Sequence, residues 1–252
     1  FGDAPDALSQ VIIGGPVVGD ALVASPEVSV ISATGSTRMG RAVGPKVAAR
    51  FGRCILELGG NNAMIVAASA DLDLASRAIV FSAVGTAGQR CTSLRRLIVH
   101  EDVYASLVPR LKSIYQRLPI GDPLDARTLV GPLVDVAAFR AMEHALAAAR
   151  AQGGAVTGGE RTLASAYPDA YYVRPALVEM PSQTAIVRVE TFAPILYVLQ
   201  YHDLEQAIAL HNDVPQGLSS CIFTTDLREA GIFLSASGSD CGIANVNIGP
   251  SG

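Results

Sequence analysis

The chain has 252 residues, half of them hydrophobic, and a formal net charge of −4, so it can bury a sizeable core and is not a disordered chain. Its basic residues are scattered, which argues against nucleic acid or an anionic membrane as a main partner. No apolar run approaches the roughly 20 residues that cross a bilayer, and no signal peptide is visible, so no membrane role is expected.

Strand-like and helix-like segments alternate along the chain, which predicts an α/β fold with a parallel sheet covered by helices. The expected strands cover residues 28–33, 54–58, 62–66, 94–100, 171–178, 194–201, 219–224 and 243–248. The expected helices cover residues 38–50, 72–84, 102–117, 137–152 and 203–211. A glycine pair at 59–60 lets the chain change direction, so a domain boundary is expected there. Because the chain starts without Met and stops within a Gly/Pro/Ser turn, it resembles a segment of a longer protein.

Residues 33–40, ATGSTRMG, join the first strand to the first helix. Free N–H groups at a helix start suit a phosphate, and Ser36 adds a hydroxyl. Gly35 and Gly40 carry no side chain that would block the approach. The segment lacks one glycine of the G-x-G-x-x-G fingerprint, so an ordinary N-cap and turn explain it equally well.

Two carboxylates lie in unusual surroundings. Glu57 interrupts the apolar strand LELGG. It is either an edge-strand carboxylate directed to solvent or a desolvated group whose raised pKa suits a general base. Glu190 lies in VETFAPI, two residues before Phe192. A simple turn accounts for Glu190, and so does a carboxylate that holds a ribose beside an aromatic ring.

Cys91 lies in the segment GTAGQRCTSLRR. Its small neighbours leave room for a ligand and its basic neighbours favour the thiolate, which is the reactive form. The alternative is a small residue buried for packing, and apolar or polar packing roles are expected for Cys54, Cys221 and Cys241. The four cysteines and four histidines show no metal-ligand spacing, so we expect no metal, no disulfides and a reducing, cytoplasmic compartment.

The chain resembles the aldehyde dehydrogenase superfamily in four motifs that follow the family's order: GSTRMG, LELGG, GQRC and ETFAP. The interval from Glu57 to Cys91 (91 − 57 = 34 residues) is also similar to that of the family. The resemblance covers nearly the whole chain. It is strongest to the antiquitin group, the α-aminoadipic semialdehyde dehydrogenases, in ELGGNNA, AVGTAGQRCT, ETFAPILYV, QGLSSCIFTTDL and GSDCGIANVNI.

The resemblance implies an aldehyde dehydrogenase-like fold. Residues 1–60 would be the end of a Rossmann-like cofactor domain, and residues 61–252 the catalytic cysteine domain. It implies oxidation of a small-molecule aldehyde, α-aminoadipic semialdehyde or a related semialdehyde, to a carboxylate. NAD is the implied cofactor, with NADP as the alternative. The full-length protein is expected to be a homo-oligomer, either a dimer or a tetramer.

The resemblance also implies a role for each matching residue. Cys91 would attack the aldehyde to form a thiohemiacetal and then a thioester, and Glu57 would activate the water that hydrolyses the thioester. The residues implied to bind the cofactor are Gly35, Ser36, Gly40, Leu58, Glu190 and Phe192. The residues implied to contact the substrate are Arg90, Thr92 and Gly252.

Three alternatives stay open. A coenzyme A-acylating aldehyde dehydrogenase would pass the thioester to a thiol, although Glu57 favours hydrolysis. A cysteine hydrolase would pair Cys91 with His100 or His211 and would need no nicotinamide. A truncated catalytic domain would keep the fold without turnover or cofactor binding of its own.

Overall fold

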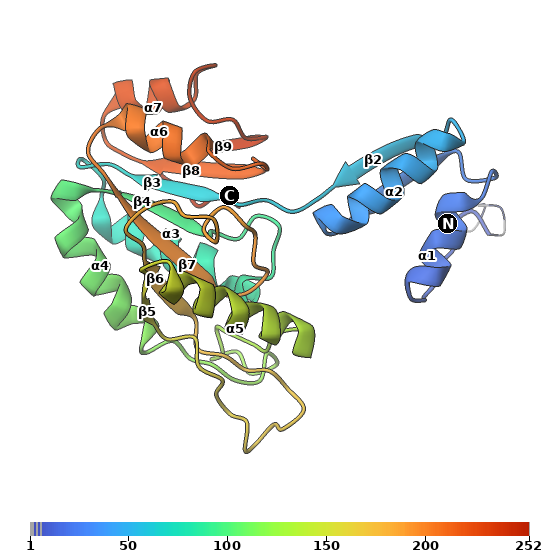
Figure 1. Ribbon diagram of the computed structural model, residues 1–252, viewed down its shortest axis with the longest axis horizontal. Coiled ribbons are helices and arrows are strands. Elements are labelled where there is room, and N and C mark those ends of the chain that lie inside the picture. Colours follow the sequence, from blue (N-terminus) through green and yellow to red (C-terminus); the bar gives the residue numbers. More distant parts are fainter. Residues whose placement is uncertain (1–2, 4, 6, 252) are drawn as a thin grey trace. The chain divides into compact units, whose positions relative to one another are not determined.

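The computed structural model describes residues 3, 5 and 7–251, and it divides the chain into two compact units, Phe1–Gly59 and Gly60–Gly252. In the first unit, α2 packs beside β2 (Figure 1), and it connects β1 to β2, which pair in parallel. Ser36 caps α2 by accepting a hydrogen bond from the Met39 N–H at 3.1 Å. The elements of this unit are α1 (Pro16–Ala24), β1 (Val30–Thr34), α2 (Thr37–Ala49) and β2 (Arg53–Glu57).

The second unit is built on a seven-stranded sheet with the order β5-β6-β7-β4-β3-β8-β9. Every neighbouring pair is parallel except β5 and β6. The strands are β3 (Ala63–Val66), β4 (Arg96–His100), β5 (Ala155–Thr157), β6 (Ala176–Glu179), β7 (Ile195–Tyr201), β8 (Ser219–Phe223) and β9 (Ile243–Val246). The helices are α3 (Leu72–Val84), η1 (Gly85–Gly88, a 3₁₀ turn), α4 (Glu101–Tyr115), α5 (Val136–Ala151), α6 (Leu204–Asn212) and α7 (Leu227–Phe233).

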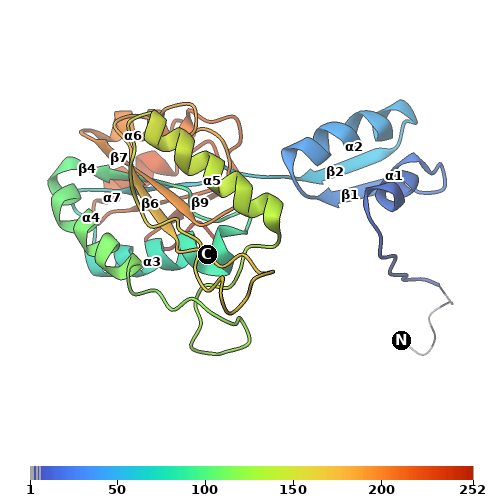
Figure 2. The same cartoon turned by 60° about the horizontal axis from the view of Figure 1, so that its bottom comes forward.

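Helices cover both faces of this sheet, with α5 and α6 on one side and α3 on the other (Figure 2). The central strands therefore need apolar side chains on both faces. All residues of β3 and β8 are buried, which explains their continuous apolar or small-residue composition. The predicted α/β class is confirmed.

Most of the predicted elements are present, but the strand expected at 171–178 is wrong over its first half. Tyr171 and Val173 form only isolated bridges, with Leu133 and Arg161 respectively. Pro175 has no N–H to donate to a ladder, and β6 begins one residue after it. The helices α1 and α7 and the strand β5 were not predicted, because all three are short and carry weak periodicity.

A buried arginine ties the sheet to the last turn of α6. Arg96 has no exposed surface, and burial lowers the pKa of its guanidinium to about 10. It donates hydrogen bonds to the Asn61 carbonyl at 2.8 Å, the His211 carbonyl at 2.9 Å and the Gln183 amide oxygen at 3.0 Å. A buried cation is tolerated where such acceptors replace water.

His211 is a buried histidine that makes stability depend on pH. Burial and then the charge of Arg96 lower its pKa from 6.5 to about 3. Between these values the unfolded chain binds more protons, so stability is lost as the pH falls below about 6.5. We expect a loss of about 2 kcal/mol at about pH 5. Urea unfolding at about pH 7.5 and about pH 5 measures this loss, which should be smaller in His211→Gln than in the unsubstituted protein. His144→Gln is the control, because His144 is exposed and its replacement should leave the loss unchanged.

Candidate active site

The segments with the predicted catalytic motifs lie where four neighbouring strands begin. Strands β3, β4, β7 and β8 are mutually parallel, and Ala63 is in register with Arg96 and Ser220. The segments that precede these strands therefore meet at the amino edge of the sheet. They include Asn62 before β3, Cys91 before β4 and Glu190 before β7.

The turn before Cys91 has an unusual backbone. Thr86, Ala87 and Gly88 have φ values of 55°, 52° and 67°, so three successive residues are left-handed. A Cβ at Gly88 would lie 2.5 Å from the Ala193 carbonyl oxygen and 2.7 Å from the Pro194 Cα. The absence of a side chain at Gly88 thus lets the GQRC loop contact the backbone of the ETFAP segment.

Cys91 is exposed in a loop that a buried amide holds in place. Asn62 donates from its Nδ2 to the Cys91 carbonyl at 2.7 Å and to the Ser93 carbonyl at 2.8 Å. Its Oδ1 accepts from the Ser219 N–H at 3.1 Å. Within the described residues, the Cys91 N–H donates to no acceptor. The loop therefore presents a thiol and a free N–H together.

The two residues beside Cys91 already have partners within this unit. The Arg90 Nε donates to the Thr86 hydroxyl at 2.7 Å, and its guanidinium lies 5.5 Å from the Phe81 ring centre. Among the described residues, no carboxylate pairs with Arg90. The Thr92 hydroxyl is 2.8 Å from that of Ser251, so the end of the chain returns to the cysteine loop. The predicted contact Gly252 lies outside the described residues.

Glu190 and Phe192 both lie against Arg95, whose contacts with them sequence reasoning missed, since it counted Arg95 only among the basic residues near Cys91. The Arg95 Nη2 donates to Glu190 Oε1 at 3.1 Å. The Phe192 ring centre is 5.3 Å from the Arg95 guanidinium, and 45% of Phe192 is exposed. Asn62 was also missed. The signal for both was a polar residue immediately before an apolar strand.

In the first unit, the predicted cofactor residues surround the start of α2. The Gly35 N–H donates to the Glu57 carbonyl at 2.9 Å, and Gly40 faces the Leu58 side chain. A pocket of about 690 Å³ lies among α1, β1 and the first turns of α2. Its lining is mostly apolar, with Ser36, Arg38 and Lys46 among the polar residues. Its size suits a small molecule.

The catalytic carboxylate expected in LELGG is the last residue of β2, where Glu57 is exposed. The desolvation considered from the sequence is therefore wrong for this unit taken by itself. The reason is that β2 has only one partner strand, β1, and no element covers most of its residues.

The histidines of the hydrolase alternative have other partners. His211 Nε2 is 2.8 Å from the Ser239 hydroxyl and 3.8 Å from Cys241 Sγ. His100 caps α4 and packs its ring edge-on against Tyr201. Among the described residues, no three or more His, Cys, Asp or Glu side chains are grouped as a metal site requires. Nor does any helix in the described part have the length and apolarity to span a membrane.

These motifs and their arrangement agree with comparisons to known proteins. Residues 2–252 match the profile of the aldehyde dehydrogenase family. The chain belongs to the aldehyde dehydrogenase family. The family membership predicted from the four motifs is therefore confirmed.

This aldehyde dehydrogenase chain is 46% identical over 248 residues to aldehyde dehydrogenase family 7 member A1 of Pisum sativum, covering 98% of the chain and 48% of the relative. It is 44% identical over 249 residues to alpha-aminoadipic semialdehyde dehydrogenase of Mus musculus, covering 98% and 46%. An NAD-dependent aldehyde dehydrogenase from Sinorhizobium meliloti superposes with a TM-score of 0.87 at 32% identity, covering 93% of the chain and 46% of that structure. The chain spans about half the length of the curated relatives it matches.

Proposed function

We propose that this protein oxidises an aldehyde to a carboxylate with NAD as the acceptor, and that its substrate is α-aminoadipic semialdehyde or a related semialdehyde. The observation that carries the proposal is the Cys91 loop, which offers an exposed thiol and a free backbone N–H on one residue. The substrate class follows the name of the Mus musculus relative, and NAD follows the name of the Sinorhizobium meliloti structure. NADP is the alternative acceptor.

The chain's own residues divide the reaction into two steps. The Cys91 sulfur attacks the carbonyl carbon, and the Cys91 N–H stabilises the oxygen that becomes negatively charged. After oxidation the substrate is held as a thioester. Glu57 takes a proton from water, whose oxygen attacks the thioester carbon and releases the carboxylate and the Cys91 thiolate. An exposed carboxylate in the first unit stays accessible to water for this role.

The residues present fit a dinucleotide. The pocket beside α2 has apolar walls for an aromatic base, and the start of α2 has N–H groups that suit a phosphate. Glu190 and Phe192 would hold the nicotinamide ribose and ring. When bound, the nicotinamide supplies the acceptor for two electrons. The remaining proposed contacts in the first unit are Gly35, Ser36, Gly40 and Leu58.

The proposed substrate carries a carboxylate at the end remote from the aldehyde. Arg90 lies next to the nucleophile and is paired with no described carboxylate, so it can bind an anionic substrate group. Thr92 and Ser251, joined by their hydroxyls, would line the same side, with Gly252 following.

A direct test is to add semialdehyde and NAD to the full natural protein and record the absorbance of reduced nicotinamide. We expect reduction that requires aldehyde and does not require coenzyme A, with NADP less effective than NAD. A strict requirement for coenzyme A would instead indicate an acylating enzyme. Ester cleavage without any reduction of nicotinamide would contradict the proposal.

A further inference from the structure

We propose that Arg95 is a positioning residue that holds the segment carrying Glu190 and Phe192 against the Cys91 loop. The inference rests on the proposed function in one respect, because it takes Glu190 and Phe192 as contacts of the nicotinamide end of the cofactor. Its structural part, the coupling of two loops by one guanidinium, stands on the contacts alone.

Arg95 is only 2% exposed, yet it lies directly after the catalytic loop. Its guanidinium joins three segments that are far apart in the sequence. These segments precede β3, β4 and β7. The acceptors of its hydrogen bonds are the carbonyls of Gly60 (3.3 Å), Gly88 (3.3 Å), Arg90 (3.1 Å) and Thr191 (2.7 Å) and the carboxylate of Glu190 (3.1 Å).

The neighbouring Arg96 shows what a purely structural arginine looks like in this chain. All the hydrogen-bond acceptors of Arg96 are carbonyl or amide oxygens, and its side chain is fully buried. Arg95 instead pairs with a carboxylate and an aromatic ring that both keep exposed surface. Its contacts therefore extend to groups that remain open to a ligand.

The pairing orients the Glu190 carboxylate. Arg95 occupies Oε1, whereas Oε2 accepts no hydrogen bond from any described residue. The carboxylate is thus fixed at one oxygen and free to accept a hydroxyl at the other. Phe192 is fixed through its ring by the same guanidinium. A ligand that uses both residues meets them already in place, which lowers the entropic cost of binding.

The Arg95 guanidinium also holds the loop that carries the nucleophile. It donates to the Gly88 carbonyl at 3.3 Å and to the Arg90 carbonyl at 3.1 Å, just before Cys91. Burial lowers the pKa of Arg95, and the Glu190 carboxylate opposes that shift. One cation therefore holds both the Cys91 loop and the Glu190 carboxylate, so its removal should loosen both segments together.

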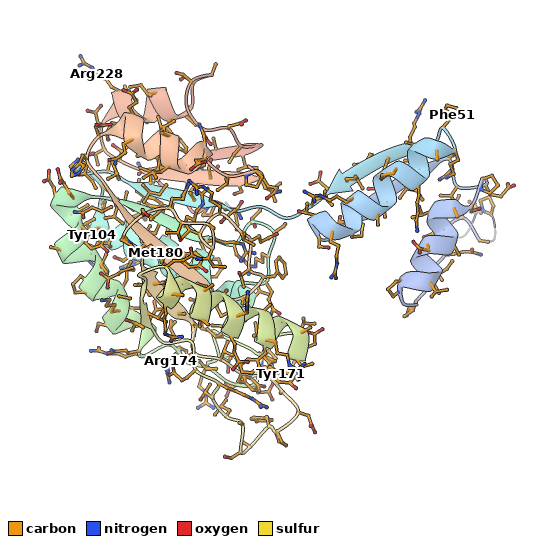
Figure 3. The ribbon with its side chains drawn as sticks, viewed as in Figure 1. Phe51, Tyr104, Tyr171, Arg174, Met180 and Arg228 are labelled. Atoms are coloured by element: carbon orange, nitrogen blue, oxygen red, sulfur yellow. The ribbon has the colours of Figure 1, made fainter. Side chains whose placement is uncertain are left out.

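The test compares Arg95→Met and Arg95→Lys in the full natural protein. Removing a charge-assisted pair from a half-buried carboxylate should raise the KM for NAD about 10- to 100-fold in Arg95→Met, with a smaller fall in kcat. Lysine keeps the charge but has no fork of donors, so Arg95→Lys should recover part of the KM. Arg174→Met is the matched control, because Arg174 pairs with Glu160 at 2.9 Å elsewhere in this unit (Figure 3).

Two readouts need no activity: amide hydrogen exchange across residues 189–195 and across the Cys91 loop, residues 86–92. We expect faster exchange in both segments in Arg95→Met, with Arg174→Met unchanged. Exchange that rises evenly over the sheet, or an unchanged KM, would overturn the proposal. If Arg95→Met does not fold, Arg95→Lys supplies the same comparison. If exchange changes locally in Arg95→Met but the unsubstituted protein never reduces NAD, the positioning role of Arg95 stands and the proposed function is refuted.

Discussion

Gly88→Ala is expected to lower the free energy of unfolding of the second unit by about 2–5 kcal/mol. A left-handed φ of 67° costs an alanine about 1–2 kcal/mol. The added Cβ would also meet backbone atoms of Ala193 at 2.5 Å, and forced overpacking costs about 1–3 kcal/mol more. Backbone atoms cannot rotate away as a flexible side chain can, so the loop or the ETFAP segment has to move.

Urea unfolding followed by far-UV circular dichroism measures this loss. Gly231→Ala is the matched control, because Gly231 lies in α7 and an added Cβ there has no heavy atom within 4 Å. Alanine in a helix should stabilise that variant by up to about 1 kcal/mol. Equal unfolding midpoints for the two variants would show that the close contact between the GQRC loop and Ala193 does not contribute to stability.

Cys91→Ser is expected to reduce aldehyde oxidation at least about 10³-fold while leaving the fold intact. A serine hydroxyl is scarcely ionised near neutral pH, so it attacks a carbonyl slowly without a base beside it. An oxygen ester is also hydrolysed more slowly than a thioester. Because the Cys91 side chain is exposed, its replacement removes no core packing.

Reduction of NAD in the presence of aldehyde measures the effect, with bound cofactor titrated separately. Cys54→Ser is the control, because Cys54 in β2 is another exposed thiol. The packing role expected for Cys54 is therefore wrong for this unit taken by itself. We expect that variant to keep its activity and Cys91→Ser to bind NAD normally. Substantial turnover by Cys91→Ser would mean that another residue forms the covalent bond to the substrate.

The alternation of segments predicted the α/β class because buried parallel strands have a strong sequence pattern. The helix at Leu72–Val84 was predicted to the residue, since Asp71 caps it and apolar positions recur along it. Short elements such as α1 and β5 contain too few residues to show a repeating hydrophobic pattern, so the sequence did not predict them. The first half of the 171–178 segment has strand-like residues, but Pro175 has no N–H for the ladder. The strand therefore begins only after Pro175.

The site was harder to predict than the fold. Motif order identified Cys91 and Glu190, whereas Asn62 and Arg95 act through contacts between distant segments. Their local signal, a polar residue before an apolar strand, does not say which segments they contact. Parallel sheets more often bind ligands at the carboxyl ends of their strands, whereas these loops gather at the amino ends. The roles of the site residues, the boundary at residues 60–61, the cytoplasmic location and the oligomeric state stay predictions.

The placement of the cysteines allows the opening of the central sheet to be measured by thiol labelling. Cys221 lies in β8 between β3 and β9, and burial raises the pKa of its thiol well above the ordinary value. A thiol reagent can reach it only when the central sheet opens, whereas it reaches Cys91 in the folded state. The delay between labelling of the exposed Cys54 and Cys91 and labelling of Cys221 therefore measures how often the sheet opens, with no engineered cysteine.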